Sequence, residues 1–251
     1  MTQIDEIVDG IYRISGPPPE GVPITFNQFL IDDERPALIH TGVHGAYDGI
    51  RKAIGEVLDP SRLAYVVLLH FEGDECGGMD RFMGGAHSAQ LVGSDMSAIL
   101  NLNTFGVDYV ERVRGVREGD AIDLGRHRLR FLETPHVHHW DSMMVFEETS
   151  ASLFPSDLFI QPGDQPPVVS EDLGDEMCGF YREVGIFAHE EPVRRTLDRL
   201  ERLEPAWIHA MHGGTLTGEI LPRYSQALRE QRFAYEGKII GRPLEEARAG
   251  A

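Results

Sequence analysis

Residues 65–69 form an uninterrupted apolar run, Tyr-Val-Val-Leu-Leu, which ends at His70. The run is too short for a helix and is rich in residues that favour strands, so it predicts a strand buried on both faces. Strand and helix patterns alternate on either side of it, and such alternation is typical of a sheet that helices cover. The chain is therefore expected to fold as a layered α/β (α+β) protein.

Hydrophobic periodicity and turn residues divide the rest of the chain into similar elements. Strands are expected at residues 11–14, 25–31, 36–40, 65–69, 89–92, 107–113, 120–124, 127–133, 142–147, 151–154 and 207–210. Helices are expected at residues 46–58, 76–83, 176–188, 190–203 and 217–235, with a short one from about Ser94. Because no repeat, low-complexity tract or linker composition interrupts this order, we interpret residues 1–251 as a single domain.

Composition and charge argue against two kinds of partner. The 251 residues are 41% hydrophobic and 25% charged, which is typical of a folded globular chain. With 41 acidic and 23 basic residues, the formal net charge of −18 would repel nucleic-acid phosphates and anionic lipids alike. We therefore expect neither a nucleic-acid partner nor a membrane partner.

The sequence also predicts a cytoplasmic location. No apolar run approaches the roughly 18 residues that span a bilayer. The first ten residues lack the basic and apolar segments of a secretory signal. Cys76 and Cys178 are too few for a disulfide framework or a four-thiolate metal site, which fits a reducing compartment.

Three residues that can bind metal follow the apolar run at alternate positions: His70, Glu72 and Asp74. In an extended segment these side chains share a face and can converge on one point. Three ionisable groups at the end of a buried strand would be costly without a counter-charge, and a cation is the natural one. The alternative is a solvated acidic turn in an acidic protein.

Three other segments place histidine or aspartate where a predicted strand meets a loop. The first holds His136, His138 and His139, the second Asp157, and the third His212. Taken singly, each is more often a surface residue or a hydrogen-bonded core residue than a metal ligand. Their joint occurrence with the first cluster, all at strand ends, favours one shared metal site.

The order of these motifs resembles a known superfamily. His-x-Glu-x-Asp from residue 70, Pro-x-x-His-x-x-Asp-Ser-Met from residue 135, Leu-Phe-x-x-Asp from residue 153 and His-Gly from residue 212 together resemble the metallo-β-lactamase superfamily. Within it, the chain is most similar to the diiron domain of flavodiiron proteins and to stand-alone oxygen-binding diiron proteins. The resemblance implies a metallo-β-lactamase-like αββα sandwich, two mixed sheets flanked by helices, with a metal pair at the sheet edges.

Carried over by position, the resemblance implies two iron ions as the cofactor. It puts His70, Glu72 and His138 on one iron, Asp74 and His212 on the other, and Asp157 between them as a bridge. Zinc hydrolases of the superfamily usually have a second histidine where this chain has Glu72. A carboxylate is a harder ligand, so the donor set suits iron or manganese better than zinc, and Zn²⁺ or Mn²⁺ are the alternatives.

The chain departs from the family pattern at two positions. Relatives usually have a second histidine where this chain has Glu75. If Glu75 is a ligand, four carboxylates face two divalent cations and the formal charge is near zero. If it is not, the second metal has an open position. At His40 superfamily members commonly have an aspartate, so His40 either orients a ligand differently or is simply a hydrogen-bonded histidine at a strand end.

Two residues are candidates for a catalytic role. Asp74 would orient the attacking hydroxide if the protein is a hydrolase. Tyr181 lies in a segment that resembles the family's tyrosine-containing helix and could reach the cleft, although packing in the core is the simpler explanation.

The resemblance implies a non-haem diiron protein that binds dioxygen, or nitric oxide, and reduces or senses it. The alternatives are a metal-dependent hydrolase of an ester, lactone, thioester or phosphodiester, and a binding protein on a disabled scaffold. The sequence leaves no room for a flavodoxin domain and has no rubredoxin-like pair of Cys-x-x-Cys motifs. A reductase would therefore need a separate electron donor, and the resemblance also implies a homodimer.

Overall fold

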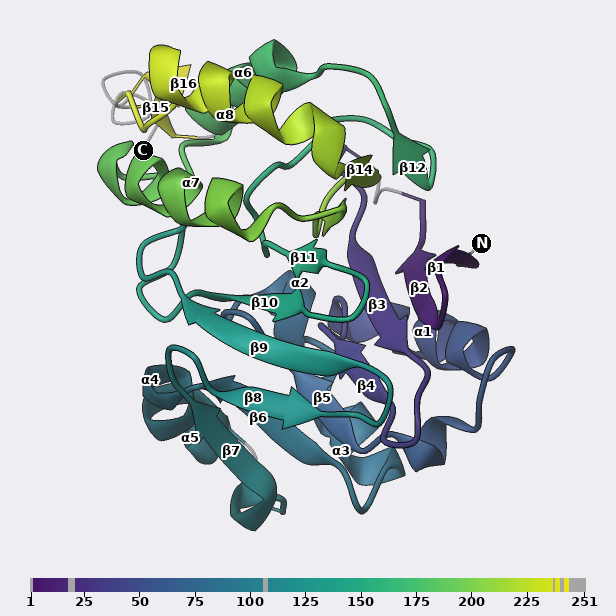
Figure 1. Ribbon diagram of the computed structural model, residues 1–251. Helices are drawn as coiled ribbons and strands as arrows, with labels where there is room; N and C mark the ends of the chain where they lie inside the picture. The colour runs from purple at the N-terminus through teal and green to yellow at the C-terminus, as the bar shows by residue number, and fades with distance from the viewer. Residues whose placement is uncertain (1, 18–20, 106–107, 237, 240–241, 244–251) are drawn as a thin grey trace.

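The computed structural model describes residues 2–17, 21–105, 108–236, 238–239 and 242–243. Two seven-stranded sheets pack face to face, and helices cover both outer faces (Figure 1). This arrangement is the αββα sandwich, two mixed sheets flanked by helices, that the family resemblance implies.

The first sheet is built from the N-terminal part of the chain, and its strand order follows the sequence. It contains β1 (Gln3–Val8), β2 (Ile11–Ser15), β3 (Asn27–Ile31), β4 (Ala37–Ile39), β5 (Tyr65–Val67), β6 (Gln90–Ser94) and β7 (Val113–Val116). The pairs from β1 to β4 are antiparallel, whereas those from β4 to β7 are parallel. The parallel strands end at one edge, and His70 follows β5 there.

The second sheet is built from the C-terminal part. Its order is β12 (Val168–Val169), β14 (Thr215–Thr217), β13 (Trp207–His209), β11 (Ser152–Phe154), β10 (Met143–Glu147), β9 (Arg128–Glu133) and β8 (Ala121–Asp123). Strands β11 and β13 are parallel neighbours. The segments that follow them, with Asp157 and His212, therefore leave the sheet at the same edge.

Helices pack on the outer face of each sheet. The first sheet is covered by α1 (Tyr47–Ile54) and α3 (Met79–Gly85), and the second by α6 (Gly174–Val184), α7 (Glu191–Leu203) and α8 (Leu221–Glu230). The remaining elements are α2 (Gly73–Cys76), α4 (Asp95–Ser97), α5 (Asn103–Phe105), a π-helix (Ala98–Leu102), four 3₁₀ helices (His44–Ala46, Pro60–Arg62, Val110–Arg112, Gly218–Ile220) and the pair β15 (Lys238–Ile239) and β16 (Arg242–Pro243). No helix among the described residues is both long and apolar enough to cross a membrane.

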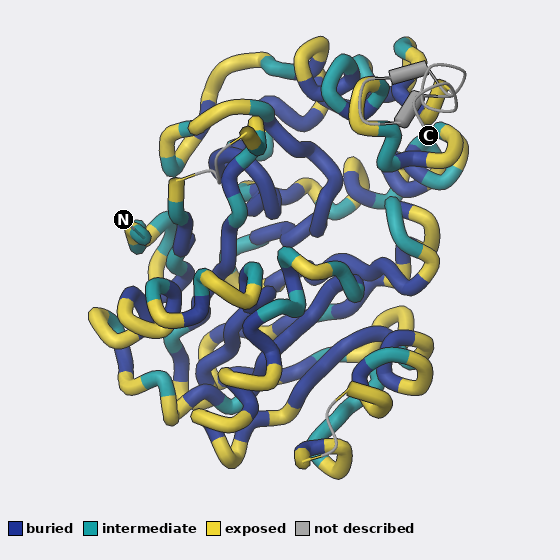
Figure 2. The backbone as a smooth tube through the Cα atoms, turned by 180° about the vertical axis from the view of Figure 1, so that it is seen from behind, coloured by how far each residue is buried: buried dark blue, intermediate teal, exposed yellow. Residues whose placement is uncertain are grey.

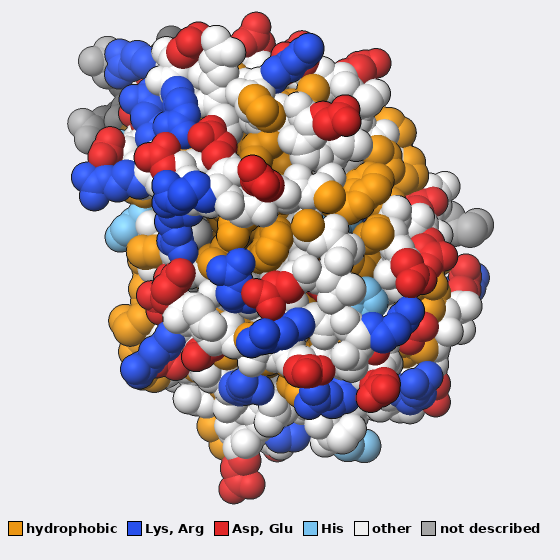
Figure 3. Space-filling view, viewed as in Figure 1, with side chains coloured by type: hydrophobic (Ala, Val, Ile, Leu, Met, Phe, Trp, Pro, Cys, Tyr) orange, Lys and Arg blue, Asp and Glu red, His pale blue; other side chains and the backbone are white. Residues whose placement is uncertain are grey.

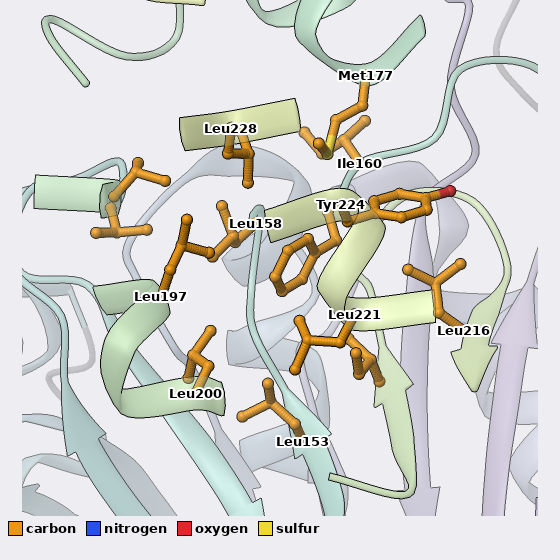
Figure 4. Packing of buried hydrophobic residues seen from close by; sticks show 14 of the residues in the cluster. Leu153, Leu158, Ile160, Met177, Leu197, Leu200, Leu216, Leu221, Tyr224 and Leu228 are labelled. Carbon is orange, nitrogen blue, oxygen red and sulfur yellow. The ribbon is translucent and has the colours of Figure 1, made fainter. Parts of the chain in front are cut away.

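Successive side chains of a strand point to opposite faces of its sheet, and the buried ones form three hydrophobic clusters. In β5, Val66 packs under α1 and α3, whereas Tyr65 and Val67 face the other way and pack between the sheets. The strand is therefore buried on both faces, as its apolar run predicts, and the buried strands form the interior in Figure 2. A third core lies under α6, α7 and α8, where Leu197 and Tyr224 pack (Figure 4). On the face in Figure 3, acidic and basic side chains are interspersed.

Several predicted elements differ in extent. The strand predicted at residues 107–113 is wrong for its described part, because Val110–Arg112 form a 3₁₀ helix and β7 begins at Val113; residue 107 lies outside the described residues. That turn brings the Arg112 guanidinium to the carbonyls of Met83, Ala86 and Ala89, to which it donates.

Four predicted helices also have different bounds, and the one predicted at residues 46–58 is limited to α1. The helix predicted at residues 76–83 is replaced by α2 and α3, which meet at Gly77 and Gly78. The helix predicted at 176–188 ends at Gly185, whose φ of 74° is left-handed. The helix predicted at 217–235 is limited to α8, because β14 and a 3₁₀ helix take up its first residues.

Asp33 ties the two sheets together, and its replacement by alanine is expected to destabilise the fold. Its carboxylate accepts hydrogen bonds from the backbone N–H of His127 at 2.7 Å, of Arg126 at 3.1 Å and of Glu34 at 2.8 Å. Burial would raise the pKa of Asp33, but these bonds outweigh it and lower the pKa to about 2. We expect Asp33→Ala to lower the free energy of unfolding by about 2 kcal/mol at pH 7, measured by urea unfolding.

The pH dependence of this loss provides a second check. A lowered pKa in the folded state stabilises the protein above the unfolded pKa near 4, and this contribution disappears as the pH falls through about 2. The difference in free energy of unfolding between wild type and Asp33→Ala should therefore shrink as the pH falls from about 4 to about 2. Asp32→Ala is the control, and a gap that stays constant down to pH 2 would contradict the prediction.

Candidate metal centre

Seven side chains from distant parts of the chain meet at one edge of the two sheets. They form two groups, in each of which the possible ligand atoms lie within 4.8 Å of one another: a first group of His70, Glu72, His138 and Asp157, and a second group of Asp74, Glu75 and His212. Six of them are the ligands that the family resemblance implies, and the seventh, Glu75, is the one whose role the sequence leaves open. The structure brings them together, and their binding of metal stays a prediction.

The turn from β5 into α2 divides the first motif between the two groups. His70 and Glu72 meet, with 3.2 Å between Nε2 and Oε2. Glu72 is still extended, but α2 begins at Gly73. Asp74 therefore turns to the second group, where its Oδ2 lies 3.6 Å from His212 Nε2. The prediction that all three residues of this motif converge on one point is wrong, because the start of the helix ends the alternation.

Asp157 lies between the two groups. Its Oδ2 is 2.9 Å from His138 Nε2 and 3.5 Å from His70 Nε2. Its Oδ1 is 3.5 Å from His212 Nε2. One buried carboxylate thus presents an oxygen atom to each group, which is the geometry that a bridging ligand requires.

Hydrogen bonds on the far side of two histidines orient their rings. His212 Nδ1 lies 2.7 Å from the carbonyl oxygen of Thr25. Because a carbonyl oxygen only accepts, Nδ1 donates and Nε2 faces the carboxylates. His70 Nδ1 lies 2.8 Å from Ser156 Oγ. Histidines that bind metals are commonly held in this way.

Sequence reasoning missed both of these supporting residues. Ser156 had a signal, since it stands directly before Asp157 at the end of a predicted strand. Thr25 acts through its backbone carbonyl. Every residue carries such a group, so no side-chain pattern could have pointed to this one.

Two buried carboxylates of the centre have oxygen atoms that accept no hydrogen bond. Glu75 is fully buried, and neither of its oxygen atoms has a hydrogen-bond partner; the same holds for Asp157 Oδ1. Burial, followed by the charges of Asp157 and Asp74, raises the pKa of Glu75 well above its usual range. Unpaired buried charge is costly. The residues present therefore fit a pair of divalent cations.

The nearby histidines respond to the same negative charge. Burial would lower the pKa of His138, but hydrogen bonds to Asp157 and Glu72 outweigh it and raise the pKa to about 10. Burial is likewise outweighed at His212, whose pKa is raised by Asp157 and Asp74. Both raised pKa values show that the surrounding carboxylates stabilise positive charge at this centre.

Tyr181 belongs to neither group. It is fully buried on α6, and its hydroxyl donates to the backbone carbonyl of Asp157 at 3.0 Å and accepts from the backbone N–H of Ile160 at 3.0 Å. Burial raises the pKa of this hydroxyl well above its usual range. Both hydrogen bonds go to backbone, so the geometry supports positioning of Asp157. The predicted catalytic role of Tyr181 stays a prediction.

The variant Tyr181→Phe is expected to destabilise the metal-free protein. It would leave the N–H of Ile160 and the carbonyl of Asp157 buried without this partner, which costs about 1–3 kcal/mol. Urea unfolding measures the loss. Tyr235→Phe is the matched control, because Tyr235 is 41% exposed. Equal stability of Tyr181→Phe and wild type would show that the hydroxyl contributes nothing to the fold.

His40 links the segments that precede two of the predicted ligands. Its Nε2 accepts from the backbone N–H of Leu69 at 3.3 Å, and its Nδ1 lies 2.8 Å from Met211 Sδ. His70 and His212 follow these two residues directly. His40 is therefore a buried, hydrogen-bonded histidine at a strand end, placed where it can hold the two segments together.

His139 borders the first group, whereas His136 does not. His139 Nε2 lies 3.7 Å from Glu72 Oε2, and its Nδ1 lies 3.6 Å from Asp141 Oδ1. Asp141 is 3% exposed. His136 is exposed on the preceding turn and does not belong to either group.

Comparison with known proteins identifies the family. The family model described as ODP family beta lactamase matches residues 24–213. This range contains every residue of the first and second groups.

Two curated relatives carry names that describe metal or gas chemistry. The flavo-diiron protein FprA2 of Clostridium acetobutylicum is 29% identical over 204 residues, 78% of this chain and 50% of that protein. A nitric oxide reductase of Moorella thermoacetica is 28% identical over 190 residues, 72% of this chain and 46% of that protein. The chain thus spans about half the length of these relatives.

A solved structure shows the same fold. The rubredoxin oxygen:oxidoreductase of Desulfovibrio gigas superposes with a TM-score of 0.82, over 91% of this chain and 61% of that chain, at 20% identity. This likeness supports the αββα architecture. Because the family model covers more than half of the sequence, the chain belongs to the ODP family of beta-lactamase-like proteins.

Proposed function

We propose that this chain binds a pair of iron ions and reduces dioxygen or nitric oxide there. The observation that carries the proposal is Asp157, whose two oxygen atoms face histidines of different groups. The names flavo-diiron protein and nitric oxide reductase, carried by two relatives, support the same chemistry.

The ligand assignment follows the two groups. We assign His70, Glu72 and His138 to one iron, Asp74 and His212 to the other, and Asp157 to both. Mixed imidazole and carboxylate donors suit iron or manganese better than zinc. The chemistry supplied by two bound ferrous ions would be the binding of a diatomic gas and the transfer of electrons to it.

Other residues of the chain orient the donors. Thr25 and Ser156 hold the rings of His212 and His70 with Nε2 toward the centre. Tyr181 holds the backbone of Asp157.

Exposure differs between the two sides of the centre. His70, Glu75 and His212 are at most 2% exposed. The side chain of Glu72, by contrast, is 42% exposed. We therefore propose that a small gas molecule enters beside Glu72.

Continued turnover requires electrons from outside the chain. Reduction of dioxygen to water consumes four electrons and four protons, whereas two ferrous ions supply only two electrons. We therefore propose a separate donor protein. The name rubredoxin oxygen:oxidoreductase, carried by a protein of the same fold, supports a rubredoxin in this role.

We also propose a homodimer in the cytoplasm. Both cysteines are free, which is compatible with a reducing compartment. Solution mass at high protein concentration tests the dimer, and a strict monomer would reject it.

Anaerobic loading with iron tests the main proposal. The protein is expected to retain about two irons per chain after gel filtration and, once reduced, to consume nitric oxide or dioxygen in the presence of an excess chemical reductant. The metal-free chain is the control. Iron retention without consumption of either gas would contradict the reductase role. Zinc with ester or lactone hydrolysis would support the hydrolase that the superfamily resemblance leaves open.

A further inference from the structure

Glu75 is buried without the hydrogen bonds that buried carboxylates usually accept. It lies on α2, is 0% exposed, and neither of its carboxylate oxygens has a hydrogen-bond partner. The contrast within the chain is Glu147, which is also 0% exposed. Glu147 accepts hydrogen bonds from the backbone N–H of Thr149 at 2.7 Å and of Ser150 at 2.8 Å. One buried glutamate is thus satisfied by the protein, and the other is not.

The carboxylate of Glu75 also reaches both groups of the centre. Its Oε2 lies 3.5 Å from His70 Nε2, a member of the first group. Glu75 itself belongs to the second group, with its ligand atom within 4.8 Å of those of Asp74 and His212. Asp157 also approaches histidines of both groups, through Oδ2 on one side and Oδ1 on the other.

We propose that Glu75 is a second carboxylate that spans the two metal positions, together with Asp157, and that it makes the centre selective for Mn²⁺ or Fe²⁺ over Zn²⁺. This inference rests on the proposed binding of two metal ions. The centre then has four carboxylates against two divalent cations, so its formal charge is near zero.

The chemistry of the donors accounts for the selectivity. Replacing an imidazole by a carboxylate makes the donor set harder and richer in oxygen, which favours Mn²⁺ and Fe²⁺ relative to Zn²⁺. Affinity at equal donors would otherwise rise from Mn²⁺ to Zn²⁺. Glu75 would therefore add to the preference for harder metals that the carboxylate of Glu72 already favours.

The burial of Glu75 predicts how its replacement affects the metal-free protein. Gln has nearly the same shape as Glu but no charge. Glu75→Gln should therefore leave the metal-free chain folded, because a buried carboxyl group without hydrogen bonds is replaced by a neutral group of the same shape. Glu147→Gln should lower the melting temperature, because a carboxylate that accepts several hydrogen bonds is lost. The critical variant is thus expected to fold.

Metal titration of the metal-free full chain tests the inference, with Mn²⁺ and Zn²⁺ as probes. Calorimetry and elemental analysis should show two Mn²⁺ per wild-type chain. In Glu75→Gln, affinity for the second Mn²⁺ should fall by at least about 100-fold, as expected when a ligand itself is lost. The electron paramagnetic resonance spectrum should change from that of a coupled pair to that of an isolated ion.

Two further variants sharpen the test. Glu147→Gln should bind two Mn²⁺ with wild-type affinity. Glu75→His should shift the ratio of Zn²⁺ to Mn²⁺ affinity toward Zn²⁺ by at least about tenfold, because it restores an imidazole donor. Both results support the inference.

The outcomes distinguish this inference from the proposed function. If Glu75→Gln binds two Mn²⁺ as tightly as wild type, Glu75 is not a shared ligand and the inference is overturned, while the gas chemistry of the iron form is unaffected. If the titrations behave as described but the iron form reduces neither gas, this inference stands and the proposed function fails. A wild-type chain that binds no metal overturns both.

Discussion

The variant Asp157→Asn is expected to lose both metal ions. In the structure one carboxylate faces histidines of both groups, with 2.9 Å to His138 Nε2 and 3.5 Å to His212 Nε2. Asparagine keeps the shape but replaces one oxygen by an N–H₂ group, which only donates and cannot bind a cation. We expect affinity at each position to fall by at least about 100-fold. Elemental analysis after anaerobic loading and gel filtration measures the retained iron.

Asp9→Asn is the matched control for Asp157→Asn. The Asp9 side chain is 87% exposed and pairs with Arg126 at the surface, so the same chemical change should leave both metals in place. Retention of two irons by Asp157→Asn would show that the carboxylate does not bridge. Loss of a single iron would place Asp157 in one group alone.

The variant Phe154→Ala is expected to lower the free energy of unfolding by about 3–5 kcal/mol. Phe154 ends β11, is 1% exposed and packs between the two sheets. Its ring lies 4.6 Å from that of His209, nearly parallel, and 5.4 Å from that of Phe29, edge to face. Alanine removes these contacts and leaves a cavity, which the rigid strands around it cannot close. Urea unfolding of the metal-free protein measures the loss.

Phe105→Ala is the control for Phe154→Ala, since Phe105 is 61% exposed. It should change the free energy of unfolding by less than about 0.5 kcal/mol. A similar small change for Phe154→Ala would mean that the two sheets do not depend on this ring for their packing. That result would contradict the description of the inter-sheet core.

Periodicity predicted the strands better than the helix ends. The apolar run at residues 65–69 is a buried strand as expected, because burial on both faces requires apolar residues at every position. The end of α6 depends on Gly185, which adopts a left-handed conformation. The 3₁₀ helix at Val110–Arg112 accompanies hydrogen bonds from a guanidinium to carbonyls more than twenty residues away, which local periodicity does not reveal.

The candidate site, like the fold, was predictable from the sequence only in part. All seven residues named from the motifs gather at one sheet edge. Their division into two groups was only partly predictable, since period-2 reasoning would have kept Asp74 on the same face as His70. Because α2 starts at Gly73, Asp74 lies in the second group and not beside His70. The start of this helix depends on how the loop packs against the rest of the molecule.

The sequence by itself determined which chemical groups are available and that they stand at strand ends. Both properties are local, because side-chain type and strand periodicity depend only on neighbouring residues. The tertiary structure decided which groups meet. Asp157 faces both groups, Glu75 lies buried without a hydrogen bond, and the carbonyl of Thr25 orients a ring 187 residues away. Such contacts depend on distances in space, which separation along the chain does not determine.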